Sequence, residues 1–220
     1  MIRVSILSFL FFLSLLSAAP VLAQTHDTHR HSFQGPDQWV KEFENPARDE
    51  WQKPHQVIQS LALKPDAVVA DIGSGTGYFA VRFAHMVPKG RIFGVDIEPD
   101  MVKYLAERAK RMGLKNLISV QAAPDDPHLP EMVDLIIIVD TFHHIENRDL
   151  YLKKLHNYLK KDGSIAIIDF RMDSVDGPPK SARSTPEQIE AELNTSGYFL
   201  AQQYDFLPKQ YFMVFKQKKN

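Results

Sequence analysis

The chain has 220 residues, of which 44% are hydrophobic and 24% charged, a composition typical of one globular domain or of one domain with small additions. The 26 Lys and Arg residues nearly balance the 27 Asp and Glu residues, which gives no electrostatic case for nucleic-acid binding. Cysteine is absent, and its absence excludes disulfides, cysteine zinc sites and a thiol nucleophile.

Residues 1–23 have the pattern of a bacterial secretory signal peptide. Arg3 provides a short positive start, residues 4–16 are strongly apolar, and small residues lead to a cut that we predict after Ala23. We therefore expect the protein to be exported to the periplasm or secreted. The apolar stretch is also about long enough to span a bilayer, so an uncleaved membrane anchor is the alternative.

Residues 24–35 read as a flexible tail that contains His26, His29 and His31. Three imidazoles so close together could hold a transition metal. We favour a solvated linker, because no downstream partner for a metal is identifiable, and we predict no metal site.

Residues 36–220 read as one domain. The segment 36–63 predicts two amphipathic helices, and 67–170 alternates between apolar runs and helical patterns. Residues 171–220 add a loop, a helix with a capping box at Thr185 and Gln188, and two closing strands. This order predicts an α/β domain whose mostly parallel sheet has helices on both faces. The expected helices are 37–44, 54–63, 79–87, 99–112, 149–160 and 185–195, and the expected strands are 67–72, 91–96, 117–121, 134–139, 164–170, 198–204 and 210–216.

The stretch VVADIGSGTGYF, residues 68–79, joins the first core strand to a helix through a glycine-rich turn. Gly73, Gly75 and Gly77 let the backbone approach a ligand closely, and the N–H groups of the next helix form an electropositive cradle. A dinucleotide fingerprint would need its third glycine where Tyr78 stands, which disfavours an NAD(P)-binding oxidoreductase. Asp96 ends the second strand, where an acidic group suits the two hydroxyls of a ribose.

The sequence resembles the class I S-adenosylmethionine-dependent methyltransferases. The resemblance lies in four segments, in family order, within about residues 54–216: Asp71-Ile72-Gly73-Ser74-Gly75-Thr76-Gly77, Gly94-Val95-Asp96, Asp134-Leu135-Ile136 and Leu159-Lys160-Lys161-Asp162-Gly163-Ser164. It is closest to the small-molecule branch that includes the ubiquinone and menaquinone methyltransferases. It implies a Rossmann-like, doubly wound, seven-stranded sheet, with S-adenosylmethionine as the cofactor.

The resemblance also implies roles for individual residues. Asp71 would orient the methionine amino group, Asp96 would accept both ribose hydroxyls, and Asp125, or alternatively Asp126, would reach the adenine amino group. The remaining cofactor-binding residues would be Gly73, Ser74, Gly75, Thr76 and Gly77 along the methionine and ribose, Ile97 and Met101 near the adenine, and Val139 and Asp140 beside the transferring methyl.

The acceptor side is described less fully by the sequence. His143 and His144 follow the fourth strand, and either could serve as a general base near neutral pH. We prefer His144, because the resemblance places this segment beside the acceptor. Arg48, Trp51 and Tyr211 are candidates for the pocket wall. The acceptor atom stays open, although the absence of Cys excludes the thiolate relay of arsenite methyltransferases.

We therefore predict a methyltransferase that acts on a small molecule by direct displacement, with no nucleic-acid partner and with membrane contact only through the leader. The alternative is an exported, non-catalytic protein that retains the fold, because S-adenosylmethionine is made in the cytoplasm. The oxidoreductase is the less favoured third interpretation.

Overall fold

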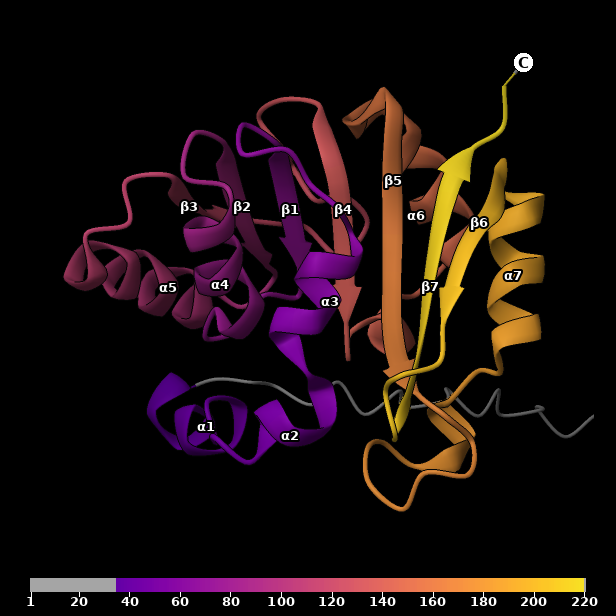
Figure 1. Ribbon diagram of the computed structural model, residues 1–220, viewed down its shortest axis with the longest axis horizontal. Coiled ribbons are helices and arrows are strands. Elements are labelled where there is room, and N and C mark those ends of the chain that lie inside the picture. Colours follow the sequence, from indigo (N-terminus) through magenta and orange to yellow (C-terminus); the bar gives the residue numbers. More distant parts are fainter. Residues whose placement is uncertain (1–34, 220) are drawn as a thin grey trace, which may run out of the picture. The chain divides into compact units, whose positions relative to one another are not determined.

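The structure is a computed structural model that describes residues 35–219, so the predicted leader and the histidines of the tail lie outside the described residues. It confirms the predicted α/β class. Seven strands form one sheet in the order β3-β2-β1-β4-β5-β7-β6. Only β7 runs antiparallel to its neighbours (Figure 1).

The strands are β1 (Val68–Ile72), β2 (Arg91–Asp96), β3 (Leu117–Gln121), β4 (Val133–Val139), β5 (Leu159–Phe170), β6 (Tyr198–Tyr204) and β7 (Gln210–Gln217). The helices are α1 (Pro36–Phe43), α2 (Arg48–Gln52), α3 (Pro54–Ser60), α4 (Tyr78–Met86), α5 (Pro99–Met112), α6 (Arg148–Leu155) and α7 (Pro186–Thr195). Short 3-10 turns cover Phe142–His144, His156–Tyr158 and Lys180–Ala182.

Two apolar cores lie on the two faces of the sheet, because successive side chains of a strand point to opposite faces. In β4, Ile137 packs in one core with Phe83 of α4 and Leu105 of α5. The next residue, Ile138, packs in the other core with Leu152 of α6 and Ile189 of α7. Strands covered on both faces in this way are continuously apolar, as β4 is.

Local signals account for most of the element ends. Gly113 ends α5 in the left-handed conformation, and the capping box that opens α7 forms between Thr185 and Gln188. The helix expected over 149–160 ends early, at Leu155, and β5 begins at Leu159 instead of residue 164. The Asp162-Gly163 pair lies inside β5, where the pairing register with β4 shifts, rather than in a turn before it.

The fold brings several polar segments to the carboxyl edge of the parallel strands. β1 pairs with β2 on one side and with β4 on the other. The order of successive strands across the sheet therefore reverses its direction between β1 and β4. Open α/β sheets bind ligands at such a switch point. In Figure 1 the arrowheads of β1, β4 and β5 point toward α1 and α2, which lie at this edge.

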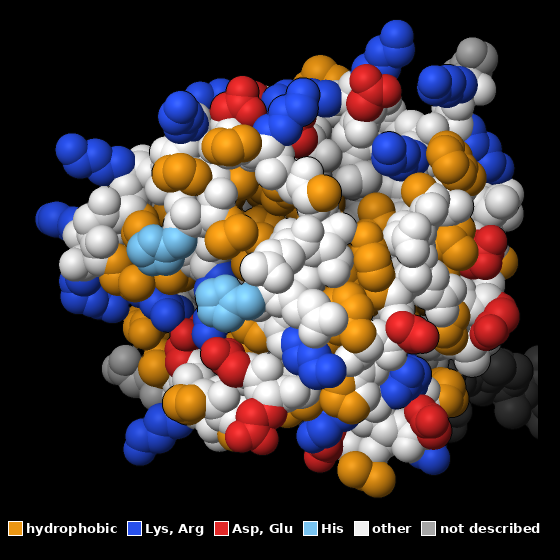
Figure 2. Space-filling model, viewed as in Figure 1, with side chains coloured by type: hydrophobic (Ala, Val, Ile, Leu, Met, Phe, Trp, Pro, Cys, Tyr) orange, Lys and Arg blue, Asp and Glu red, His pale blue; other side chains and the backbone are white. Residues whose placement is uncertain are grey.

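Positive and negative side chains, drawn blue and red, are interspersed over the face that Figure 2 shows. Within residues 35–219, no helix is long and apolar enough to cross a membrane.

Candidate active site

The glycine loop, residues 73–77, is held tightly against the neighbouring strands. The N–H groups of Gly73 and Ser74 donate to the carbonyl of Val95 in β2, at 2.8 and 3.0 Å. Gly73 has a φ of 74°, and a Cβ there would lie 2.2 Å from the Oγ1 of Thr141, which follows β4. Only glycine fits this close approach, which joins the carboxyl ends of β1 and β4.

Ser74 presents an unused polar atom inside the loop. Its hydroxyl is buried and has no hydrogen-bond partner among residues 35–219. A buried polar group without a partner is costly and calls for an explanation such as a missing ligand. The hydroxyl therefore fits a site that a polar ligand completes.

Asp96 lies beside the loop with its carboxylate held in place. Oδ2 accepts the Gly75 N–H at 2.8 Å and Oδ1 accepts the Glu98 N–H at 3.0 Å. Burial raises the pKa of this carboxyl, while these backbone donors act in the opposite direction. Nearby, the side chain of Met101 is buried whereas Ile97 is 49% exposed, so Ile97 offers an apolar surface next to the carboxylate.

Asp71 is almost fully buried, with 3% of its surface exposed, and this burial raises its pKa to about 7. Its carboxyl accepts the backbone N–H of Ala80 in the first turn of α4, which opposes the rise. The predicted contact with a methionine amino group stays a prediction.

Asp140 forms the centre of a buried polar cluster after β4. Its Oδ2 accepts from Arg48 at 3.2 Å and from Gln52 at 3.0 Å, and its Oδ1 accepts from Gln210. Burial raises the pKa of Asp140 to about 6, and Arg48 opposes the rise. Val139, the last residue of β4, is buried directly before it.

Sequence analysis missed Gln52 and Gln210, two fully buried amides that also bond to each other at 3.0 Å. They come from α2 and from the start of β7. Nothing in their local sequence distinguishes them from exposed glutamines, and only their common partner Asp140 reveals their role.

Residues 36–53, which we call the N-terminal segment, cover the glycine loop. Phe43 lies 3.5 Å from the position that a Cβ of Gly75 would take. Glu44 accepts the Thr76 hydroxyl at 2.7 Å and pairs with Arg108 of α5. The segment includes α2, a helix in a stretch that the sequence predicted only as a pocket wall.

A second contact fixes the N-terminal segment to α4. Asp49 pairs with Arg82 at 2.9 Å and accepts the hydroxyl of Tyr78. Together with the bonds from Arg48 and Gln52 to Asp140, these contacts fasten the segment at three points. The segment therefore lies over the glycine loop and the end of β4.

A carboxylate holds His143 in place. Its Nδ1 lies 2.8 Å from Oδ2 of Asp169, and the two side chains are only 7% and 5% exposed. His144 is exposed, with its ring centroid 4.1 Å from that of His143. Sequence analysis missed Asp169, although an acidic residue near the end of the apolar strand SIAIIDF was a usable signal.

The three candidate wall residues do not share one surface. Arg48 lies over the ring of Tyr78 at 4.1 Å, and Trp51 packs on Phe170 at 5.6 Å. Tyr211 is paired with Asp169, the residue before Phe170, so it points to the opposite face of the sheet from Phe170. Tyr211 is buried among apolar side chains of the core that α6 and α7 cover.

Asp125 and Asp126 have other partners in the structure. The side chain of Asp125 is 82% exposed and pairs with Lys154 of α6 at 3.1 Å. Asp126 accepts from the Tyr158 hydroxyl at 2.7 Å, and such contacts hold its pKa below the ordinary value. The role of either residue in adenine recognition stays a prediction.

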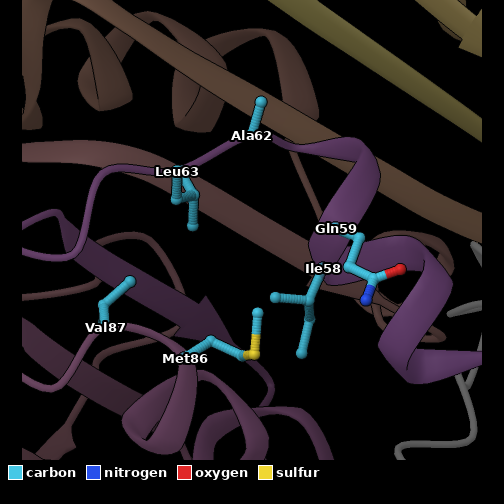
Figure 3. A pocket seen from close by; sticks show the side chains of 6 residues that line it. All are labelled: Ile58, Gln59, Ala62, Leu63, Met86 and Val87. Carbon is cyan, nitrogen blue, oxygen red and sulfur yellow. The ribbon is translucent and has the colours of Figure 1, made fainter.

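Two pockets lie away from the glycine loop, and one of them, of about 540 Å³, is lined by His156, Gly197, Gln217 and Lys218. The other, of about 220 Å³, lies between α3 and the last turn of α4, at the other end of α4 from the glycine loop. Figure 3 shows that its lining is mostly apolar, with Gln59 as the one polar side chain drawn. Residues 35–219 contain no group of three or more residues able to hold a metal ion.

Comparisons with known proteins agree with this geometry. Residues 63–215 match the family described as "Methyltransferase domain". The erythromycin 3''-O-methyltransferase of Saccharopolyspora erythraea is 29% identical over 135 residues, which cover 58% of this chain and 44% of that protein. A ubiquinone/menaquinone biosynthesis C-methyltransferase of Edwardsiella ictaluri is 32% identical over 116 residues, which cover 51% of this chain and 46% of that protein.

The matched residues thus span less than half of the length of these two relatives. Among solved structures, a SAM dependent methyltransferase from Aquifex aeolicus superposes with a TM-score of 0.77 at 26% identity. That match covers 82% of this chain and 97% of the other chain.

Proposed function

Since the chain belongs to the class I S-adenosylmethionine-dependent methyltransferase family, we propose that it transfers a methyl group from S-adenosylmethionine to a small-molecule acceptor. The observation that carries the proposal is the arrangement at the switch point. The glycine loop lies there between the carboxylate of Asp96 and the start of the segment that follows β4.

The residues present fit the cofactor. Asp96 has an unused lone pair on each oxygen and so can accept ribose hydroxyls while it holds Gly75 and Glu98. The orphaned hydroxyl of Ser74 can bond to a polar ligand atom inside the loop. Ile97 provides an exposed apolar side chain next to Asp96 that suits a flat base.

When bound, S-adenosylmethionine supplies an activated methyl group on a sulfonium. The protein then has to hold the acceptor in line with that methyl, and such orientation contributes on the order of 7–11 kcal/mol in the best cases. The N-terminal segment supports this by covering the glycine loop and by bonding to Asp140 at the end of β4.

Calorimetric titration of the full chain with S-adenosylmethionine and, separately, with NAD tests the proposal. We expect micromolar binding of S-adenosylmethionine alone. Asp96→Ala should weaken that binding by more than tenfold. Glu131→Gln should leave it unchanged, because Glu131 pairs with Arg91 at the start of β2, whereas Asp96 is at its end. Binding of NAD alone would favour an oxidoreductase, and binding of neither would favour the non-catalytic interpretation.

We also propose that residues 1–23 direct export and are removed after Ala23. Expression of the full chain in a bacterial host, followed by cell fractionation and N-terminal sequencing, tests this. A mature protein that starts at Gln24 outside the cytoplasm is expected. A cytoplasmic protein that retains Met1 would refute export, and a membrane fraction with an intact leader would favour the anchor.

A further inference from the structure

We propose that the amino edge of the sheet, where its parallel strands begin, is a docking surface for an anionic lipid bilayer. The inference goes beyond the proposed function and does not rest on it. It starts from two features that meet at this edge, a row of exposed lysines and the apolar pocket of about 220 Å³ between α3 and α4.

Six lysines stand along the amino edge, and all of them are exposed. They are Lys64, Lys89 and Lys115 before β1, β2 and β3, Lys161 near the start of β5, and Lys216 and Lys219 near the end of β7, which reaches this edge because it runs antiparallel. None of the six forms an ion pair within residues 35–219. In Figure 2 blue side chains line the upper edge, which is the amino edge in this view.

The acidic residues of the same edge do not cancel this charge. Glu131 pairs with Arg91, and Asp134 pairs with Lys160 at 2.8 Å, so each of these carboxylates has a cation of its own. Two further carboxylates, those of residues 66 and 162, are exposed without an ion pair in the described part of the chain. Six unpaired lysines against two unpaired carboxylates leave an excess of four positive charges, although the whole chain has a formal net charge of −1.

The apolar pocket lies beside two of these lysines. The turns that carry Lys64 and Lys89 are joined, because the N–H of Lys89 donates to the carbonyl of residue 65 at 3.0 Å. Both turns lead directly into the pocket lining, in which residue 63 precedes Lys64 and residue 87 lies two positions before Lys89. Figure 3 shows the side chains of Ile58 and Met86 directed toward each other, and Met86 is 44% exposed.

Cations beside an apolar hollow suit a partner that is anionic at its head and apolar in its body. A bilayer of anionic phospholipids presents both, because its phosphates attract lysines and its acyl chains accept apolar side chains. The lysines extend over the strand ends from β3 to β7, so they can contact many headgroups at once. A bilayer surface therefore matches both the charge and the extent of the edge.

A nucleic acid fits the edge less well than a bilayer does. Single strands are bound by aromatic side chains between the cations, and no aromatic residue lines the pocket between Lys64 and Lys89. The six unpaired cations are all lysines, whereas arginine has the planar fork that matches phosphate in nucleic-acid recognition. The leader proposed for residues 1–23 also brings the chain to a membrane.

Docking by the amino edge leaves the candidate active site facing away from the bilayer. The glycine loop follows the carboxyl end of β1, and Asp140 follows the carboxyl end of β4, so both lie at the opposite ends of the strands from the lysines. Substitution of the lysines should therefore leave the binding of S-adenosylmethionine unchanged.

A label at one position reports whether this edge meets the lipid. The chain has no cysteine, so one introduced cysteine can carry a nitrobenzoxadiazole group. Gln59→Cys places the label at the pocket, and Val175→Cys places it on a 95% exposed residue in the loop after β5. With the full chain and vesicles of equal parts phosphatidylglycerol and phosphatidylcholine, the label of Gln59→Cys should brighten and shift to the blue, and that of Val175→Cys should not change. Vesicles of phosphatidylcholine alone should change neither label, even if the leader inserts.

The charge dependence is measured in the Gln59→Cys background. Each lysine near an anionic surface contributes about fivefold in affinity, so Lys64→Gln together with Lys89→Gln should raise the lipid concentration at half-maximal response by about 25-fold. The matched control, Lys41→Gln together with Lys180→Gln, removes two exposed lysines from α1 and from the loop after β5. It should change that concentration by less than about twofold.

A second pair of substitutions guards against a local defect at the pocket. Lys161→Gln together with Lys216→Gln removes charge near the other end of the row, away from α3 and α4, and should weaken the response by a similar factor. Urea denaturation and titration with S-adenosylmethionine should give the same values for each variant as for its parent.

Three results would overturn the proposal. They are a Gln59→Cys label that does not respond to anionic vesicles, an equal response to phosphatidylcholine alone, and an equal loss in the control pair. A stronger response to duplex DNA than to anionic vesicles at the same phosphate concentration would assign the edge to a nucleic acid instead. The proposed function fails separately, by the absence of S-adenosylmethionine binding in calorimetry.

Discussion

The buried carboxyl of Asp71 should make the folded protein less stable as the pH rises. Its pKa is raised from 3.8 to about 7, chiefly because burial disfavours the charged form. The folded chain therefore binds this proton more tightly than the unfolded chain does. Between about pH 4 and pH 7 the unfolded state releases the proton first, so stability falls through this window.

The magnitude follows from the pKa values. At about 1.4 kcal/mol for each pH unit, the rise from 3.8 to about 7 corresponds to about 4 kcal/mol of stability lost at pH 8.5. Asp71→Asn removes the titration and keeps an oxygen that accepts the Ala80 N–H. We therefore expect the variant to be more stable than the wild type, by an amount that grows by about 3 kcal/mol between pH 5 and pH 8.5.

Urea denaturation of both proteins at pH 5 and pH 8.5 measures this difference. Comparing the variant with the wild type at each pH cancels the titrating groups that do not interact with Asp71, such as Asp140. Asp66→Asn, which changes an exposed carboxyl just before β1, is the matched control. A stability difference that is the same at both pH values would refute the reasoning.

Three other substitutions probe the closure of the site. Glu44→Gln removes the charge that pairs with Arg108, so amide hydrogen exchange in the N-terminal segment should rise at least threefold while that in β4 stays unchanged. Gly73→Ala should destabilise the fold by about 1–3 kcal/mol in urea, because its Cβ collides with Thr141, and Thr141→Ala, which removes the two closest atoms, should restore part of the loss. Arg48→Gln leaves Asp140 without its cation, so it should cost about 3 kcal/mol more at pH 8 than at pH 5, where Asp140 is protonated. An equal cost at both pH values would show that the charge of Asp140 is not involved.

The sequence predicted the sheet and the glycine loop because both depend on local patterns. The continuous apolar strands, Gly113 at a helix end and the capping box of Thr185 each act within a few residues. The loop around Gly73 was recognisable because only glycine fits where Thr141 approaches the backbone, and this glycine is visible in the sequence.

The polar cluster around Asp140 was harder to predict because its residues are joined only in space. Gln52 and Gln210 meet Asp140 from segments far apart in the chain, and a glutamine has no local pattern that marks burial. The contact that holds His143 was also hidden from local sequence, because its partner Asp169 lies in β5, far along the chain.

The bond between Gln52 and Gln210 joins residues 158 positions apart, almost from one end of the described chain to the other. During synthesis the chain grows from its N-terminus, so α2 exists long before β7 emerges. Until then Asp140 lacks one of its three donors, and the N-terminal segment lacks part of its anchor. A nascent chain can thus build the glycine loop early, yet it completes the polar cluster of Asp140 only with its final strand.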